Sequence, residues 1–174
     1  ESMSNEKCFK FVHIPIQSGN NRILAKMLRE NTVEDYIQIV ALLKEKIPDV
    51  TISTDVIVGF PTESEDEFND TLKLISQTMP DVLNISRYAP RQYTMAYKMK
   101  SLAGGIVKER SRMMTNEFNK ISLENNQRWL GWHGWALIDE IGKDDTLVCR
   151  NFAYKPIIIK RGRSHPGEVV NLKI

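Results

Sequence analysis

Hydrophobic and polar residues follow two different periods in the first part of the chain. Residues 50–58 form an almost continuous apolar and β-branched run, which predicts a buried strand. Elsewhere apolar residues recur every three or four positions, which predicts amphipathic helices. The predicted elements are, in order, strand 9–14, helix 22–29, helix 32–47, strand 50–58, helix 64–79 and strand 82–88. This alternation, with connections long enough to cross over, is typical of an α/β fold with parallel strands.

The pattern changes near Trp129. A charged helix over 106–128 leads into short β-branched segments separated by turns, which is typical of a small all-β barrel. We therefore divide the chain into domains 1–128 and 129–174. Because three strands are too few for a closed barrel, we expect the first domain to be half of something larger, so that either the chain is truncated or a partner completes the sheet. The open sheet edge is one through which two copies could associate.

Charge is unevenly distributed along the 174 residues. The net charge is +2, but residues 150–174 contain six basic residues and one acid, Glu168, which gives +5 and leaves −3 for the rest. A basic C-terminal segment suggests contact with a polyanion. The alternative is a solvated basic edge that keeps strands from aggregating.

The two cysteines, Cys8 and Cys149, stand alone in the sequence. They indicate neither a disulfide framework nor a zinc site, and the three histidines lack metal-ligand spacing. We therefore assign no metal ligands. No apolar run is long enough to span a bilayer, so we expect a reduced, cytoplasmic protein with no membrane partner.

The turn after the 50–58 strand is the first candidate site. Gly59 and Pro61 end the strand, and the Ser64 to Glu67 segment is a capping box that opens a helix. In parallel sheets ligands bind at the carboxyl ends of strands. Residues 59–63 therefore predict a small-molecule site, and a plain turn is the alternative.

Two stretches of the chain resemble signature motifs of the radical-SAM methylthiotransferases. These are HIPIQSG at 13–19 and TDVIVGFPTE at 54–63. Enzymes of this family add a methylthio group to tRNA or to a ribosomal protein. Gly131-Trp132, Arg150-Asn151, Tyr154-Lys155-Pro156 and 167–170 are similar to the TRAM RNA-binding domain. The resemblance implies a partial (β/α) radical-SAM barrel followed by a small all-β TRAM barrel of the OB-like type.

The resemblance implies that S-adenosyl-L-methionine is a cofactor. Ile57, Gly59 and Glu63 match a motif that supports its adenine. Gln17 and Ser18 lie where they could bind ribose hydroxyls, and Arg29 where it could pair with the methionine carboxylate. For Arg29 alone, a surface arginine at a helix end is the alternative.

In the TRAM-like segment the resemblance implies contacts to RNA. Basic side chains would contact phosphates, and Tyr154 could stack on a base. The predicted RNA-binding residues are Arg150, Tyr154, Lys155, Lys160, Arg161 and Arg163.

A radical-SAM enzyme holds a [4Fe–4S] cluster on a Cys-xxx-Cys-xx-Cys motif, and methylthiotransferases carry a second cluster. Neither Cys8 nor Cys149 belongs to such a motif. We therefore expect the ligands of both clusters to lie outside this chain, which would be inactive alone and contain no catalytic residue.

The loop after the 82–88 strand departs from the pattern of the family that it resembles. Gln92-Tyr93 stands where Pro-Gly normally follows the arginine in that family. Tyr93 does not easily take the positive φ of glycine.

Residues 84–88, 108–112 and 129–132 look most like the archaeal and eukaryal branch of the family. This branch methylthiolates C2 of N6-threonylcarbamoyladenosine next to the anticodon, which implies a tRNA anticodon stem-loop as partner. The sequence does not identify a sulfur donor. The alternatives are isopentenyladenosine tRNA, a ribosomal protein aspartate, or a non-catalytic RNA-binding module. An RNA methyltransferase is disfavoured because no Gly-x-Gly-x-x-Gly loop follows a strand.

Overall fold

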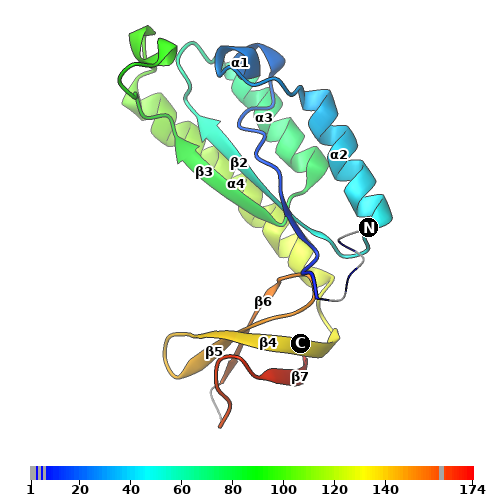
Figure 1. The fold of residues 1–174 in the computed structure, drawn as a ribbon. Helices are drawn as coiled ribbons and strands as arrows, with labels where there is room; N and C mark the ends of the chain where they lie inside the picture. Colours follow the sequence, from blue (N-terminus) through cyan, green and yellow to red (C-terminus); the bar gives the residue numbers. More distant parts are fainter. Residues whose placement is uncertain (1–2, 4, 6, 161–162) are drawn as a thin grey trace.

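The structure is a computed structural model that describes residues 3, 5, 7–160 and 163–174. Its first part contains a parallel sheet with strand order β1-β2-β3 (Figure 1). The strands are β1 (Phe11–His13), β2 (Thr51–Val58) and β3 (Val82–Arg87). The predicted parallel arrangement is confirmed, since both pairings run parallel.

Four α-helices accompany this sheet, and two of them begin at the predicted positions. Thr32 and Ser64 each form a capping box with the third residue of the helix that follows. The helices are α1 (Asn21–Lys26), α2 (Val33–Lys46), α3 (Glu65–Thr78) and α4 (Gly104–Gln127), with a short 3-10 helix, η2 (Met95–Lys98), before α4. No helix in the described part of the chain has both the length and the apolar character needed to cross a bilayer.

The two faces of the parallel sheet differ in chemistry. Val56 and Val58 of β2 pack on α3 and α4, in a core that includes Phe68 and Met114. Because side chains alternate along a strand, Asp55 and Ile57 project from the opposite face. That face also carries the exposed residues His13, Asn84 and Ser86. The polar face is therefore the one available to a ligand.

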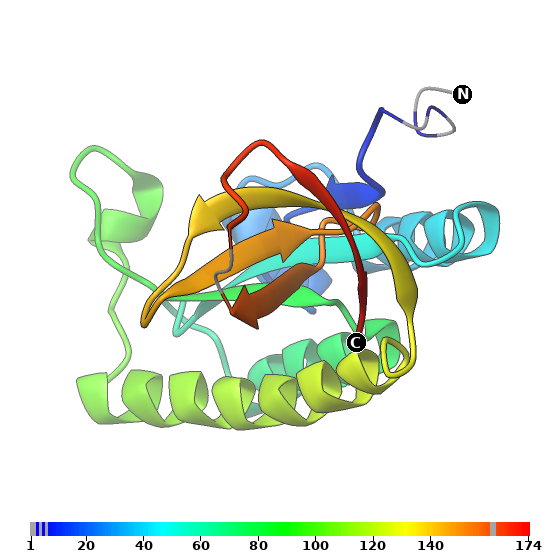
Figure 2. The same ribbon diagram turned by 90° about the horizontal axis from the view of Figure 1, so that it is seen from below.

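The C-terminal part is an antiparallel sheet with strand order β6-β5-β4-β7. Its strands are β4 (His133–Ile141), β5 (Thr146–Arg150), β6 (Pro156–Lys160) and β7 (Val169–Lys173). The sheet curls (Figure 2), and a register shift between Ile138 and Glu140 contributes a bulge. Among the described strands, β6 and β7 are edges, so the curled sheet is compatible with a small barrel without closing into one.

The two sheets are joined through residues 151–155. The backbone N–H of Lys10 donates to the carbonyl oxygen of Phe152 at 2.8 Å. The hydroxyl of Thr51 donates to the carbonyl oxygen of Ala153 at 2.6 Å. These contacts tie the start of β2 to the loop between β5 and β6. The boundary predicted near Trp129 falls in the connection between α4 and β4.

Candidate cofactor site

A groove of about 730 Å³ lies at the carboxyl ends of β2 and β3. Its floor is formed by alternate residues of the two strands, including Asp55, Ile57, Asn84 and Ser86. This is the end of a parallel sheet at which ligands usually bind, and the volume is typical of small-molecule sites.

The rims of the groove are positively charged. One rim is formed by residues 26–29, at the end of α1, and the other by residues 87–89 and Arg91, at the end of β3. The only acid among the described lining residues is Asp55. The cationic lining residues are Lys26, Arg29, Arg87 and Arg91. The groove is therefore suited to a ligand that carries at least one anionic group.

Asp55 lies at the centre of a polar cluster on the groove floor. His13 Nε2 is 3.0 Å from Asp55 Oδ1, and the Asn84 amide donates to the same oxygen at 2.8 Å. Asp55 Oδ2 makes no hydrogen bond to a described residue. It is available to accept a hydrogen bond from a ligand amine or amide. The sequence analysis did not predict this cluster, because the two partners come from the neighbouring strands β1 and β3.

Three of the predicted cofactor residues line the groove, namely Gln17, Arg29 and Ile57. Gln17 is fixed by its backbone, which accepts from Ile57 N–H at 2.9 Å and donates to the Asp55 carbonyl oxygen at 2.8 Å. Arg29 is exposed and has no carboxylate within 4 Å among the described residues. Its guanidinium is therefore free to bind an anion.

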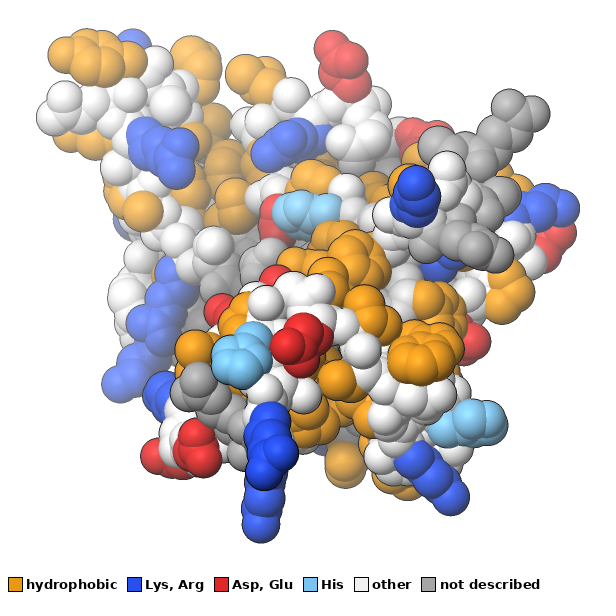
Figure 3. All heavy atoms as spheres, turned by 60° about the horizontal axis from the view of Figure 1, so that its bottom comes forward, with side chains coloured by type: hydrophobic (Ala, Val, Ile, Leu, Met, Phe, Trp, Pro, Cys, Tyr) orange, Lys and Arg blue, Asp and Glu red, His pale blue; other side chains and the backbone are white. Residues whose placement is uncertain are grey.

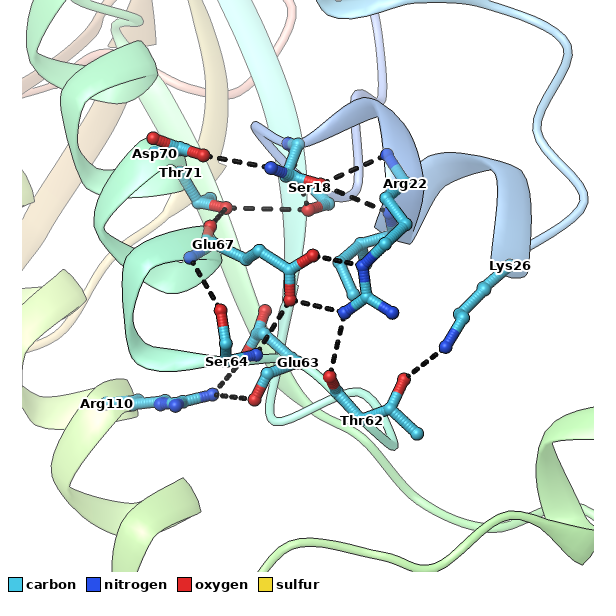
Figure 4. A network of polar contacts seen from close by, with 12 residues as sticks. Ser18, Arg22, Lys26, Thr62, Glu63, Ser64, Glu67, Asp70, Thr71 and Arg110 are labelled. Atoms are coloured by element: carbon cyan, nitrogen blue, oxygen red, sulfur yellow. Dashed lines mark hydrogen bonds and ion pairs between the residues drawn. The ribbon is translucent and has the colours of Figure 1, made fainter.

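The other three predicted cofactor residues lie behind the groove. Ser18 is fully buried, with its hydroxyl 3.5 Å from that of Thr71 on α3. Glu63 is buried and accepts from the Gly59 backbone N–H at 3.0 Å and from Arg110 Nη1 at 2.6 Å (Figure 4). The structure gives these residues packing and hydrogen-bonding roles, and their contact with a cofactor stays a prediction.

Glu63 and Arg110 form a buried ion pair between the β2–α3 turn and α4. Burial raises the pKa of the Glu63 carboxyl, and the Gly59 N–H and the Arg110 guanidinium act in the opposite direction. Gly59 itself has φ +77°, and a Cβ there would lie 2.6 Å from Val107 Cγ2. The close approach that requires glycine is therefore to α4.

A second network, which the sequence did not reveal, connects α1 to α3. Arg22 binds the Glu67 carboxylate through Nε and Nη2 and donates to the Thr62 carbonyl oxygen at 2.9 Å (Figure 4). Lys26 donates to the Thr62 hydroxyl at 2.7 Å. The hydrogen bonds from Arg22, with those from Ser64, lower the pKa of Glu67 to about 2. The network holds one groove rim against the turn that follows β2.

The loop after β3 takes the conformation that its sequence disfavours. Tyr93 has φ +66°, in the left-handed region, and its side chain is fully exposed. The expectation that a tyrosine would avoid this conformation is therefore wrong for this loop. Thr94 supports the turn that follows by accepting from the Tyr97 backbone N–H at 3.2 Å.

The residues predicted to bind RNA are divided between the junction and the surface. Tyr154 packs edge-on against Phe9 and Phe11, and the Arg150 guanidinium lies 4.6 Å from the Tyr154 ring centroid. Arg150 also pairs with Asp139 at 3.1 Å.

Lys155 binds Asn126 on α4, and burial lowers the pKa of its ammonium group. Lys160 and Arg163 are exposed, and Arg161 lies outside the described residues. Hydrophobic side chains gather over the small sheet, with Lys and Arg side chains standing apart around them (Figure 3). The exposed apolar residues there include Trp135, Ile158 and Val169.

Comparison with known proteins shows which proteins the chain is similar to. The family model of the Radical SAM superfamily matches residues 1–75. Over 171 residues the chain is 44% identical to the "probable threonylcarbamoyladenosine tRNA methylthiotransferase" of Archaeoglobus fulgidus, covering 98% of this chain and 40% of the relative. The Pyrococcus abyssi protein of the same name is 41% identical over 99% of this chain and 41% of its own length. Nearly the whole chain is thus similar to one part of these methylthiotransferases.

Other relatives carry a different substrate in their names. The "tRNA-2-methylthio-N(6)-dimethylallyladenosine synthase" of Thermosipho africanus is 34% identical over 100% of this chain and 41% of the relative. The chain thus spans about two fifths of the length of these curated methylthiotransferases.

Among solved structures, coproporphyrinogen III oxidase from Escherichia coli, a radical SAM enzyme, matches with a TM-score of 0.56 and 20% identity, covering 65% of this chain and 27% of that one. This likeness shows the fold.

The residues of this chain do not fit an iron–sulfur cluster. Within the described ranges, no three His, Cys, Asp or Glu side chains are arranged to hold a metal ion. Cys8 is exposed and Cys149 is buried in the small sheet, in the other part of the molecule. Among the described residues, the candidate cofactor site is therefore the groove at the carboxyl ends of β2 and β3.

Proposed function

We propose that this chain provides the cofactor groove and an RNA-contacting surface of a radical SAM transferase that methylthiolates C2 of N6-threonylcarbamoyladenosine beside the anticodon of a tRNA. The observation that supports this most strongly is the groove, which brings residues of both signature stretches to one end of a parallel sheet. The names of the Archaeoglobus and Pyrococcus relatives support the substrate.

The groove fits S-adenosylmethionine in its chemistry. Arg29 offers a guanidinium to the methionine carboxylate, and the free oxygen of Asp55 can accept from the ammonium group. Ile57 provides an aliphatic wall for the adenine, and Gln17 offers an amide for hydrogen bonds. When bound to a reduced [4Fe–4S] cluster, this cofactor supplies the radical chemistry of the superfamily. The protein's part is to orient the cofactor and the substrate base in the groove.

We further propose that the ligands of both clusters lie outside this chain, so the chain alone is inactive. The Lys160, Arg161 and Arg163 segment of the small sheet is proposed to contact RNA phosphates, because it concentrates positive charge. A cytoplasmic location is part of the same proposal, because tRNA is modified and used there.

A second candidate substrate is dimethylallyladenosine in tRNA, which the Thermosipho relative carries in its name. The charge of the groove favours the first candidate. A threonylcarbamoyl group carries a carboxylate, whereas a dimethylallyl group is uncharged. With four cations and one acid among its described lining residues, the groove has positive charge beyond what the cofactor carboxylate would neutralise.

Disruption of the gene in the organism that encodes it tests the proposal. Digested tRNA should lose 2-methylthio-N6-threonylcarbamoyladenosine, and the unthiolated nucleoside should accumulate, as measured by mass spectrometry. Returning the intact gene should restore the modification. An unchanged nucleoside profile would refute the function, and loss of the dimethylallyl product instead would assign the second substrate.

A further inference from the structure

A second, shallower groove of about 480 Å³ lies beside the candidate cofactor site, between the end of β3 and the first half of α4. Arg87 lines both grooves, so the two meet at this side chain. The second groove is lined by Arg87, Gly105, Lys108, Glu109, Ser111, Arg112, Thr115 and Asn116. None of the residues predicted from the sequence to bind the cofactor or RNA is among them.

The spacing along α4 explains why these residues share one surface. Lys108 and Arg112 are four positions apart, and Thr115 and Asn116 follow one turn later, so they lie on the same side of the helix. Arg110 and Met114 point the other way: Arg110 is buried against Glu63 and Phe68, and Met114 in the core beneath β2. One side of α4 thus packs on the core, while the other presents hydroxyl, amide and cationic groups.

The cations of this second groove are not neutralised by the protein. Arg87 and Lys108 have no carboxylate within 4 Å among the described residues. Arg112 lies 3.9 Å from Glu109, but both side chains are mostly exposed, so the pair is weak. Three cations and one acid leave this surface with a charge of +2.

We propose that the second groove binds backbone phosphates of the RNA substrate and guides the strand past Arg87 into the cofactor groove. Cationic, hydroxyl and amide side chains are those that contact phosphates and ribose. The lining contains no aromatic residue on which a base could stack, which favours the backbone over the bases. The inference rests on the proposed function in taking tRNA as the substrate.

Fluorescence anisotropy of a labelled anticodon stem-loop RNA, titrated with the 174-residue chain at several salt concentrations, tests this assignment. The triple variant Arg87→Gln/Lys108→Gln/Arg112→Gln should bind roughly tenfold more weakly, with a salt slope smaller by about 2, since each lost single-strand contact removes about 0.7. The matched control is Lys7→Gln/Lys46→Gln/Lys73→Gln, which removes the same charge from exposed sites that lie outside α4.

The control triple should keep most of the affinity. Equal weakening in the two triples would show that only net charge matters, and an unchanged affinity in the first triple would also overturn the inference. The titration is repeated with adenosine and with N6-threonylcarbamoyladenosine beside the anticodon. If the side chains contact phosphates, the triple variant should lose the same affinity for both RNAs. A loss of affinity for the modified RNA alone would instead show that these side chains bind the substrate carboxylate, and would overturn the inference. The proposed function itself is tested separately, by mass spectrometry of digested tRNA after gene disruption, so its failure can be distinguished from a failure of this inference.

Discussion

Gly59 has φ +77°, and a side chain at this position would meet Val107 of α4. In the sequence this glycine matches a motif that supports the adenine of the cofactor. The structure shows that α4 occupies the space in which its Cβ would project. The residue type is therefore explained by helix packing, independently of any cofactor.

Replacing Gly59 with alanine should destabilise the protein by about 2–4 kcal/mol, because left-handed strain and a clash with Val107 add together. Gly131→Ala is the matched control, since Gly131 also has positive φ (+81°) but has no atom within 4 Å of the added Cβ. Gly131→Ala should therefore be destabilised only by the backbone strain of an alanine at positive φ. Urea unfolding measures both, and Val107→Ala should partly rescue Gly59→Ala. Equal losses for the two glycines would contradict the packing explanation.

In the ion pair between Glu63 and Arg110, only one of the two residues could be recognised from the sequence. Glu63 was recognisable because it belongs to a contiguous motif. Arg110 lies 47 positions away on α4, and its spacing there predicts only that it is one charged residue among several. A partner contributed by a distant helix leaves no local pattern, so this pair could be found only in the folded chain.

At the scale of elements, the Arg22–Glu67 pair links α1 to α3 and makes stability depend on pH. The Glu67 pKa falls from 4.5 to about 2 on folding. A carboxyl with a lowered folded pKa stabilises the protein fully above its unfolded pKa, and the stabilisation is lost as pH falls through the folded value. The contribution should therefore disappear between about pH 4.5 and pH 2.

The size of this effect should be about 1–2 kcal/mol, less than the full pKa shift would give, because Arg22 is half exposed and screened by solvent. Urea midpoints of the wild type and Glu67→Gln, compared from pH 6 to pH 2, measure it. The difference between the two proteins should shrink toward pH 2. Glu65→Gln, in the same helical turn but exposed, should show a constant difference. If the difference in stability between the wild type and Glu67→Gln does not change with pH, ionisation of Glu67 is not the source of the stabilisation.

Elements were more predictable than the contacts between them. Periodicity and caps located all three parallel strands and the starts of α2 and α3, because these signals are local. The predicted 22–29 helix is shorter in the structure, where α1 ends at Lys26 and Arg29 follows on the groove rim. Of the six predicted cofactor residues, three line the groove and three support it from behind, a distinction that depends on which way each side chain points.

At the scale of the whole molecule, Tyr154 lies where the two sheets meet. Its ring packs against Phe9 and Phe11 and beneath Arg150, and the loop that carries it hydrogen-bonds to the start of β2. The sequence assigned this tyrosine to base stacking. The contacts that form the junction join residues more than a hundred positions apart, which no local pattern encodes.

Tyr154→Ala should lower the melting temperature by several degrees, because it removes aromatic packing at the junction worth about 2–4 kcal/mol. RNA affinity should change less than twofold. Trp135→Ala, which removes an exposed aromatic of the small sheet, should have little effect on melting. Calorimetry and the anisotropy titration separate the two roles. If Tyr154 stacks on a base instead, the variant will lose about 1–3 kcal/mol of binding energy and melt normally.

Helix α4 sets the distance between the grooves and the small sheet. The helix has 24 residues, which at 1.5 Å per residue is about 36 Å. It begins beside the grooves and ends at the small sheet (Figure 1). Any molecule that contacts both ends must extend over about this distance. A free nucleoside or a short loop can reach only one of them. Under the proposed function, reach alone would therefore separate a long structured RNA from the single nucleotide that is modified in it.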